Sequence, residues 1–164
     1  MTTKEPLVGF DEFDENKIIS DAAAIDSYIP QRHEMRQLDA IIFECEETMR
    51  CVGYKDLKDD EFWVNGHFPG SPLMPGVVAC ECACQVSAYY ASKFKLVDGT
   101  MGLGSLDSVK FRGPMRPGDR LIMMIARRKY RPNMLFNCQF QIFIDKELVV
   151  DGVIKGVPLP EGFI

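Results

Sequence analysis

The sequence predicts an α+β domain in which a curved antiparallel sheet of about six strands wraps around one long central helix. Residues 76–94 contain no proline or glycine after the first position, which is typical of a helix of about four to five turns. Strand-like segments separated by turn residues stand on both sides of it in the sequence. The helix is apolar on most sides, so it must be buried, and a curved sheet can bury it.

The region before this helix begins without clear periodicity. Residues 1–19 mix acidic and apolar residues, and we expect a loosely ordered extension to a single domain that comprises residues 20–164. Residues 21–28 can form a short helix that ends before Pro30, because proline cannot continue a helix. The strands expected next are 40–45 and 48–56.

An irregular loop leads into the long helix. Residues 62–75 hold two glycines and three prolines, a composition typical of stiff, irregular backbone. Pro75 suits the first position of the helix, where its missing N–H would have had no partner in any case. Glu81 and Gln85 are the polar exceptions in the middle of the helix, which makes them candidates for function.

After the helix the pattern changes to strands and turns. Residues 116–119 read Arg-Pro-Gly-Asp, with proline and glycine at the two central positions of a type II turn. Residues 145–146 predict a tight hairpin, and the glycine-rich residues 99–104 predict a turn. Polar and apolar residues alternate within the third of the following strands, as in a strand with one dry and one wet face. These strands are expected at 106–112, 120–128, 135–144 and 147–157.

Composition and the N-terminal residues indicate a cytoplasmic globular protein. The apolar fraction is 46% and the charged fraction 26%, both close to globular averages. No run of about 18 apolar residues is free of charge, and the N-terminus has no signal-peptide pattern, so neither a membrane span nor export is expected. The six cysteines are therefore expected to be reduced and buried.

Positive charge is concentrated in the second half of the chain. Although the net charge is −5, residues 110–131 hold eight basic side chains and a single acidic one. Such an excess favours an anionic partner, while strand ends solvated by arginine and lysine give the same pattern. Nucleic acid is not the expected partner, because the segment has few aromatic residues and no recognition helix.

The most informative segment is residues 67–81, which read HFPGSPLMPGVVACE. His67 precedes Glu81 by 14 positions, and Gln85 follows one helical turn later. This pattern resembles the signature of the beta-hydroxyacyl-acyl-carrier-protein dehydratases of bacterial fatty acid synthesis. That signature has His-Phe-Pro-Gly, a second Pro-Gly pair, a glutamate in the helix and then Ala-Gln.

Two further segments resemble the same family. Residues 29–32 read Ile-Pro-Gln-Arg, similar to the family's Leu-Pro-His-Arg, and residues 106–121 are similar to its later signature V-K-F-R-x-P-V-x-P-G-D-x-L. The resemblance therefore covers about residues 20–157. It departs at Gln31, which stands where the family has histidine, and we assign the nearby His33 no catalytic role.

The resemblance implies a hotdog fold and the dehydration of a (3R)-3-hydroxyacyl-[acyl-carrier-protein] to the trans-2-enoyl product. It implies acyl carrier protein as the partner, with no metal and no other cofactor. The family's active sites lie at a dimer interface, which implies a homodimer or a trimer of dimers with His67 from one subunit and Glu81 from the other. Glu81 stands where isomerising relatives carry aspartate, which favours dehydration without double-bond migration.

Dehydration needs a base for the C2 proton, an acid for the departing C3 hydroxyl, and a donor to the thioester oxygen. His67 is the base candidate, because a histidine ring is largely neutral near pH 7. Glu81 is the acid candidate, since its apolar helix favours a protonated carboxyl group. Gly76 offers a backbone N–H at the positive end of the helix. Taken alone, His67 could be a packing histidine and Glu81 a structural carboxylate. Their occurrence together at this spacing favours catalysis.

Further site residues are predicted from the same motifs. For Gln85, a role in orienting Glu81 and a purely structural role are both open. The residues expected to contact the substrate are Phe68, Pro69, Gly70, Pro75, Val77 and Gln85. The residues expected to dock the carrier protein are Lys110, Arg112, Arg116 and Arg120.

Other functions fit the sequence less well. Zinc binding by the helix cysteines is disfavoured, because residues 80 and 82 point about 200° apart on a helix and no histidine converges with them. No clear partner would activate one of them as a nucleophile. A hotdog acyl thioesterase would share the fold but needs no His-Phe-Pro-Gly loop. A non-catalytic acyl-chain-binding paralogue is the second alternative, favoured by Gln31 and the cysteine-rich helix.

Overall fold

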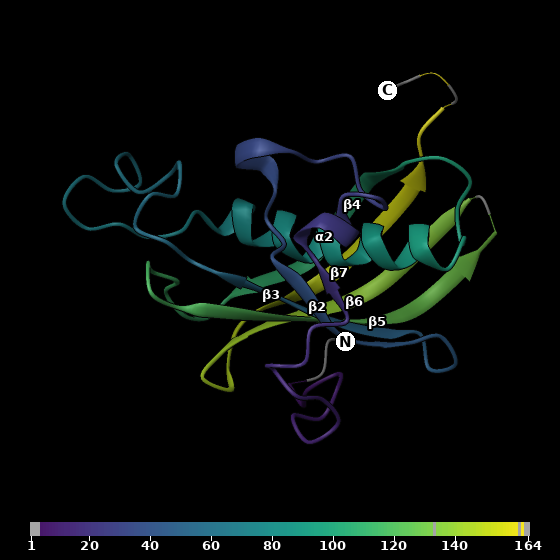
Figure 1. Ribbon diagram of the computed structural model, residues 1–164, viewed down its shortest axis with the longest axis horizontal. Helices are drawn as coiled ribbons and strands as arrows, with labels where there is room; N and C mark the ends of the chain where they lie inside the picture. The colour runs from purple at the N-terminus through teal and green to yellow at the C-terminus, as the bar shows by residue number, and fades with distance from the viewer. Residues whose placement is uncertain (1–3, 133, 161, 163–164) are drawn as a thin grey trace.

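The structure is a computed structural model that describes residues 4–132, 134–160 and 162. Within these residues, seven strands form one antiparallel sheet in the order β1-β2-β3-β5-β6-β7-β4, and the long helix α2 lies across one face of it (Figure 1). No helix of this part of the chain is both long and apolar enough to cross a membrane. The elements in chain order are β1 (Ser20–Asp21), α1 (Ala22–Ile25), the 3-10 helix η1 (His33–Met35), β2 (Ala40–Cys45), β3 (Arg50–Asp56), α2 (Gly76–Lys93), β4 (Met101–Phe111), β5 (Arg120–Arg131), β6 (Leu135–Ile144) and β7 (Glu147–Pro158).

Helix α2 is the buried centre of the domain. Its N-terminal cap is Pro75, whose extended backbone and missing N–H separate the preceding loop from the helix. Ten side chains of the helix are buried, including the whole of Tyr89 and Tyr90. The Tyr90 hydroxyl donates to the Cys45 carbonyl and the Tyr89 hydroxyl to the Glu44 carboxylate, each at 3.0 Å. The helix is therefore buried without leaving these hydroxyls unpaired.

Strand β6 shows the predicted alternation but not the predicted wet face. Phe136 and Phe140 belong to the core around α2, whereas Gln139 and Gln141, at the alternate positions of the strand, point to the other face of the sheet. Both glutamines are buried, contrary to the expectation of a solvated face. The side-chain oxygen of Gln141 accepts a hydrogen bond from the Leu7 N–H at 2.8 Å. The N-terminal segment thus takes the place of water on this face.

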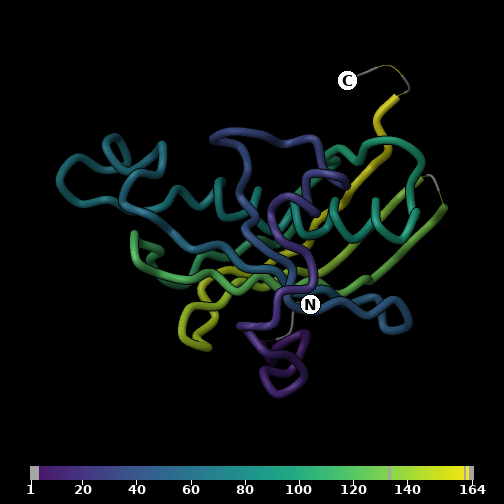
Figure 2. The backbone as a smooth tube through the Cα atoms, viewed as in Figure 1, coloured from purple at the N-terminus to yellow at the C-terminus, as the bar shows by residue number. Residues whose placement is uncertain are grey.

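Residues 7–13 lie on the face of the sheet opposite to α2 (Figure 1 and Figure 2). Val8 is fully buried there, and Arg50 of β3 holds the segment through two contacts of 2.8 Å with the Glu12 carboxylate. A segment expected to be loosely ordered therefore packs against the sheet, because buried apolar surface offsets the entropy lost on ordering. The outer cluster consists of Leu7, Val8, Phe10, Phe13, Ile42, Phe43, Val52, Tyr54, Ile122, Met124, Phe143 and Leu148.

The first helix is shorter than expected. Asp21 caps it by accepting a hydrogen bond from the Ala24 N–H at 2.9 Å, but the helix predicted over residues 21–28 ends at Ile25. The Ser27 N–H then bonds to the Ala24 carbonyl at 3.1 Å and the Tyr28 N–H to the Ile25 carbonyl at 2.9 Å, so the chain tightens to a spacing of three residues. The remaining residues before Pro30 therefore form turns.

Strand β4 begins where a turn was expected. Residues 99–104 predicted a turn, yet Gly102 pairs with Val157 of β7 as part of a strand. A Cβ on Gly102 would lie 2.5 Å from Leu159, so glycine allows this side chain to pack across the strand. The expected 106–112 strand is thus the second half of a longer one. The other expected strands agree with the structure within about three residues, and the two-residue β1 was not expected.

Two predicted turns are present. Gly118 has a φ of 95°, and the Asp119 N–H bonds to the Arg116 carbonyl at 3.0 Å, as in a type II turn. Asp145 and Lys146 both have positive φ, 48° and 67°, which matches a two-residue hairpin of the I′ type. The Arg116 turn is important for the site, because it follows the segment that packs against the loop before α2.

Candidate active site

His67 lies in the loop between β3 and α2, and this loop's own backbone orients its ring. The Leu73 N–H bonds to the His67 carbonyl at 2.7 Å, and the Leu73 carbonyl lies 2.7 Å from His67 Nδ1. A carbonyl can only accept, so Nδ1 carries the hydrogen and, in the neutral ring, Nε2 has the free lone pair. The ring also stacks on Phe68, with centroids 4.2 Å apart. The loop therefore leaves His67 Nε2 with a lone pair that can accept a proton.

An apolar groove of about 290 Å³ lies beside His67. Buried Met74 donates its N–H to the Met115 carbonyl at 2.8 Å, which ties the His67 loop to the segment after β4. A groove of this character suits an acyl chain. Sequence reasoning missed most of its lining, for which the only signal was the later motif around residues 106–121. The lining residues are His67, Leu73, Met74, Gly76, Val77, Phe111, Gly113, Pro114 and Met115.

The N-terminus of α2 meets this groove at Gly76. A backbone bond of the first turn runs from the Val78 N–H to the Pro75 carbonyl at 2.9 Å, so the Gly76 N–H precedes the helical bonds. That N–H lies at the positive end of the helix dipole, where a thioester oxygen would be stabilised. A Cβ at Gly76 would lie 2.5 Å from the Phe111 ring. Glycine therefore lets Phe111 and the helix start share one wall of the groove.

Glu81 lies further along α2, outside the groove of its own chain. It follows Gly76 by five residues, or about 7.5 Å of helix rise. Glu81 is not among the described residues that line the groove. Its Oε1 accepts hydrogen bonds from Gln85 Nε2 at 2.8 Å and from Gln31 Nε2 at 3.4 Å. Within one chain, His67 and Glu81 are therefore not brought to the same groove. The contact with Gln31 was not predicted.

The predicted substrate contacts fall into two groups. Those that lie at the groove or at the two candidate catalytic side chains are Phe68, Val77 and Gln85. Those that shape the backbone and do not line this groove are Pro69, Gly70 and Pro75. Gly70 has a φ of 74°, a conformation that favours glycine, and both it and Pro69 are exposed. A turn role explains these two residues without substrate contact.

The four predicted docking residues differ in how free their charges are. Arg112 bonds to buried Asp151 at 2.7 Å. Arg120 makes two contacts, at 2.6 and 2.8 Å, with the carboxylate of Asp56 at the end of β3. Lys110 and Arg116 are exposed, and neither has an ion pair among the described residues. The last two are therefore the cations best able to meet an acidic partner near the groove.

The basic stretch 110–131 does not form one surface. Its first part adjoins the His67 loop, whereas its last part lies at the other end of β5, beside the β5–β6 turn (Figure 1). A single partner at the groove would meet only the first part. The exposed cations at the far end are Arg127, Arg128, Lys129 and Arg131.

The cysteines of α2 are poor candidates for nucleophiles. All six are free thiols. Burial raises the pKa of Cys80 to about 11 and that of Cys84 further, so both are protonated near neutral pH. In the described ranges, no group of three or more histidine, cysteine, aspartate and glutamate side chains is arranged to hold a metal ion.

Known proteins share this sequence pattern. Residues 29–153 match the family described as the FabA-like domain. A protein from Syntrophobacter fumaroxidans named 3-hydroxyacyl-[acyl-carrier-protein] dehydratase FabZ is 35% identical over 136 residues, which cover 80% of this chain and 89% of that protein. A protein of the same name from Thermomicrobium roseum is 36% identical over 135 residues, covering 82% of this chain and 89% of that one.

Solved structures share the fold. The dehydratase heterocomplex ApeI:P from Xenorhabdus doucetiae includes a chain that superposes with a TM-score of 0.70 at 15% identity, covering 84% of this chain and 91% of that one. Cj0977, a sigma28-regulated virulence protein from Campylobacter jejuni, superposes with a TM-score of 0.68 at 12% identity, covering 92% and 98%. The α+β hotdog fold predicted from the sequence is thus confirmed. The chain belongs to the beta-hydroxyacyl-acyl-carrier-protein dehydratase family, which its His67 to Glu81 signature had indicated.

Proposed function

We propose that this protein removes water from a (3R)-3-hydroxyacyl-[acyl-carrier-protein] to form the trans-2-enoyl product, in fatty acid or related lipid biosynthesis. The observation that carries the proposal is the His67 Nε2 lone pair, which the Leu73 carbonyl orients beside an apolar groove. The names of the FabZ relatives support the same reaction. The free thiols fit the cytoplasmic location that we propose with it.

The proposed reaction uses three groups. His67 Nε2 removes a proton from C2, and the electron pair of that C–H bond forms the C2–C3 double bond as the C3–O bond breaks. The partner subunit's Glu81 protonates the leaving hydroxyl, which departs as water. The Gly76 N–H stabilises the negative charge that develops on the thioester oxygen. The imidazolium and carboxylate then return to their starting states by exchanging protons with water.

A second protomer supplies the acid that the groove of one chain lacks. Strand β4 is an edge strand of the sheet, with β7 on one side only, so its other backbone edge is free to pair. Exposed apolar side chains on β4 and around the start of α2 favour coverage by a second copy. We propose a homodimer that joins through this region. The exposed side chains are Phe68, Val77, Leu103 and Phe111.

The direct test is mass spectrometry of purified protein incubated with 3-hydroxyacyl carrier proteins of graded chain length. The expected result is a product lighter by one water, with the acyl group still attached to the carrier. A thiol-release assay run in parallel detects hydrolysis instead, which would favour a thioesterase. Substrate that is retained without conversion would favour the non-catalytic binder.

Gly76→Ala is expected to lower kcat/KM about tenfold, because the new methyl group displaces the Phe111 ring into the groove. Phe111 is 54% exposed and can swing aside, so the melting temperature should change little. Steady-state kinetics and thermal unfolding measure the two effects. Adding Phe111→Leu should restore part of the activity, whereas a fully active Gly76→Ala variant would place substrate elsewhere.

Charge reversal at Lys110 and Arg116 is expected to raise the KM for acyl carrier protein about tenfold with kcat unchanged, since neither cation has an ion pair with another described residue. The KM for a small acyl-pantetheine substrate should not change, because it lacks the acidic carrier. Arg127→Glu with Arg128→Glu is the matched control at the far end of β5. Equal effects from both pairs would contradict docking at the groove.

A further inference from the structure

Two side-chain amide groups of its own chain donate hydrogen bonds to Glu81. Gln85 lies one turn further along α2, and Gln31 lies in the segment between α1 and η1. Both side chains donate to the same carboxylate oxygen, Glu81 Oε1, at 2.8 and 3.4 Å. The sequence separation of 50 positions between Gln31 and Glu81 means that only the fold brings them together.

The orientation of the Gln85 amide is determined by the backbone. Gln85 is fully buried. Its Oε1 accepts from the Gln37 N–H at 2.9 Å, and its Nε2 donates to the Met35 carbonyl at 2.6 Å. If the amide oxygen and nitrogen were exchanged, the amide N–H groups would face the Gln37 N–H and the amide oxygen would face the Met35 carbonyl. Gln85 therefore always presents an N–H to Glu81.

Gln31 is held differently. Its Oε1 is buried and has no hydrogen-bond partner within the described residues, so its amide lacks the backbone contacts that orient Gln85. Among the described residues, the Gln31 side chain makes one hydrogen bond, the donation to Glu81 Oε1. The amide of Gln31 is thus committed to the carboxylate and to no other group described in the structure.

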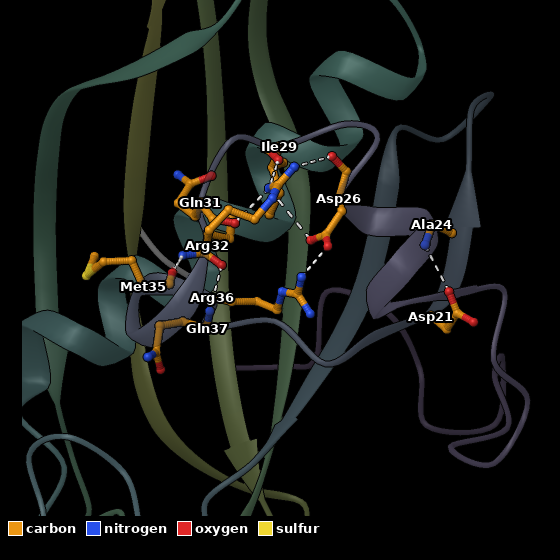
Figure 3. Close-up of polar contacts among 10 residues, drawn as sticks. Asp21, Ala24, Asp26, Ile29, Gln31, Arg32, Met35, Arg36 and Gln37 are labelled. Atoms are coloured by element: carbon orange, nitrogen blue, oxygen red, sulfur yellow. Dashed lines mark hydrogen bonds and ion pairs between the residues drawn. The ribbon is translucent and has the colours of Figure 1, made fainter. Parts of the chain in front are cut away.

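Two arginines anchor the backbone that carries Gln31. The Arg32 guanidinium donates to the Ile29 carbonyl at 2.7 Å, to the Gln31 carbonyl at 2.8 Å and to the Asp26 carbonyl at 2.8 Å (Figure 3). Arg36 is ion-paired with the Asp26 carboxylate in the same view. The segment is therefore tied to the end of α1, while Gln85 ties its continuation to α2 through the Gln37 N–H and the Met35 carbonyl.

We propose that Gln31 is a positioning residue for Glu81, acting together with Gln85. An oxygen that accepts two N–H groups is a poor place for a proton, because an O–H there would face the donors. The two amides thus reserve Oε1 as an acceptor, and Oε2 is the oxygen that carries the proton to the leaving hydroxyl. This inference rests on the proposed dehydratase function and assigns different tasks to the two oxygens of its acid.

Gln31→Met removes both amide groups while keeping the length of the side chain. The expected result is a kcat about fivefold lower, the equivalent of one modest hydrogen bond, with KM unchanged because Gln31 does not line the groove proposed for the acyl chain. Gln31→His restores an N–H donor and should recover most of the lost kcat. Gln31→Glu keeps the length of the side chain but removes the N–H donor, so it should not recover the kcat that Gln31→His recovers.

The matched control is Gln139→Met, the same replacement at a buried site on the outer face of β6. It should keep the wild-type kcat. A wild-type kcat in Gln31→Met, or a kcat that does not recover in Gln31→His, overturns the inference about Gln31. The proposed dehydratase function still stands in that case if His67→Ala is inactive. An inactive wild-type protein overturns the proposed function itself, so the two failures are distinguishable.

Discussion

Replacing His67 with alanine is expected to lower kcat by about two to four powers of ten, because the reaction loses the base that removes the C2 proton. The His67 side chain is only partly buried, and within the described residues it makes one hydrogen bond, to the Leu73 carbonyl. The melting temperature should therefore fall by only a few degrees, about the effect of losing one modest interaction. Steady-state formation of the enoyl product and a thermal melt measure the two quantities.

His33, the other histidine of the chain, provides the matched control. It is exposed and has a φ of 54°, so asparagine is the replacement that best tolerates its backbone. His33→Asn should retain the wild-type kcat, since this residue does not line the groove. Near-normal kcat in His67→Ala would show that another group is the base, and the proposed mechanism would be wrong.

A mixture of two inactive variants is expected to regain activity. His67→Ala and Glu81→Ala each lack one group at both sites of a dimer, so each should lose about two to four powers of ten in kcat. After random subunit exchange about half of the dimers are hybrids, and each hybrid has one intact pair and one doubly defective pair. The expected activity of the mixture is roughly a quarter of the wild-type value.

To remove the dependence on exchange, the two variants are also produced together with different tags, and the purified hybrid should have about half of the wild-type activity. The matched control combines His67→Ala with the His67→Ala/Glu81→Ala double variant, a mixture in which no dimer has an intact pair. Recovery in the first mixture alone supports a site shared between subunits. A hybrid no more active than its parents contradicts sharing and returns Glu81 to a structural role within its own chain.

The parts of the candidate site that could be predicted are those encoded locally. His67, Gly76 and Glu81 belong to one loop and the helix that follows it, so their spacing in the chain already restricts their arrangement. The contact between Gln31 and Glu81 joins segments 50 positions apart, and no local pattern indicates it. The same holds for most of the groove, whose walls come from the His67 loop and from the segment after β4.

The basic residues illustrate the same limit. Local composition indicated an anionic partner for the whole of residues 110–131. Strand β5 is extended, so its two ends are far apart, and the cations divide between them. Ion pairing then divides the cations near the groove into paired and unpaired ones, because Arg112 pairs with Asp151 of β7. Which charges are free is therefore a property of the folded chain.

The sequence by itself determined the long buried helix, the alternation of β6 and the two side chains proposed for acid–base chemistry, because each depends on residues close together in the chain. Tertiary structure alone decided that residues 7–13 cover the outer face of the sheet and that β4 starts at Met101. It also decided that Glu81 does not line the groove beside His67 of its own chain. These features depend on packing and pairing between distant segments, which local periodicity does not encode.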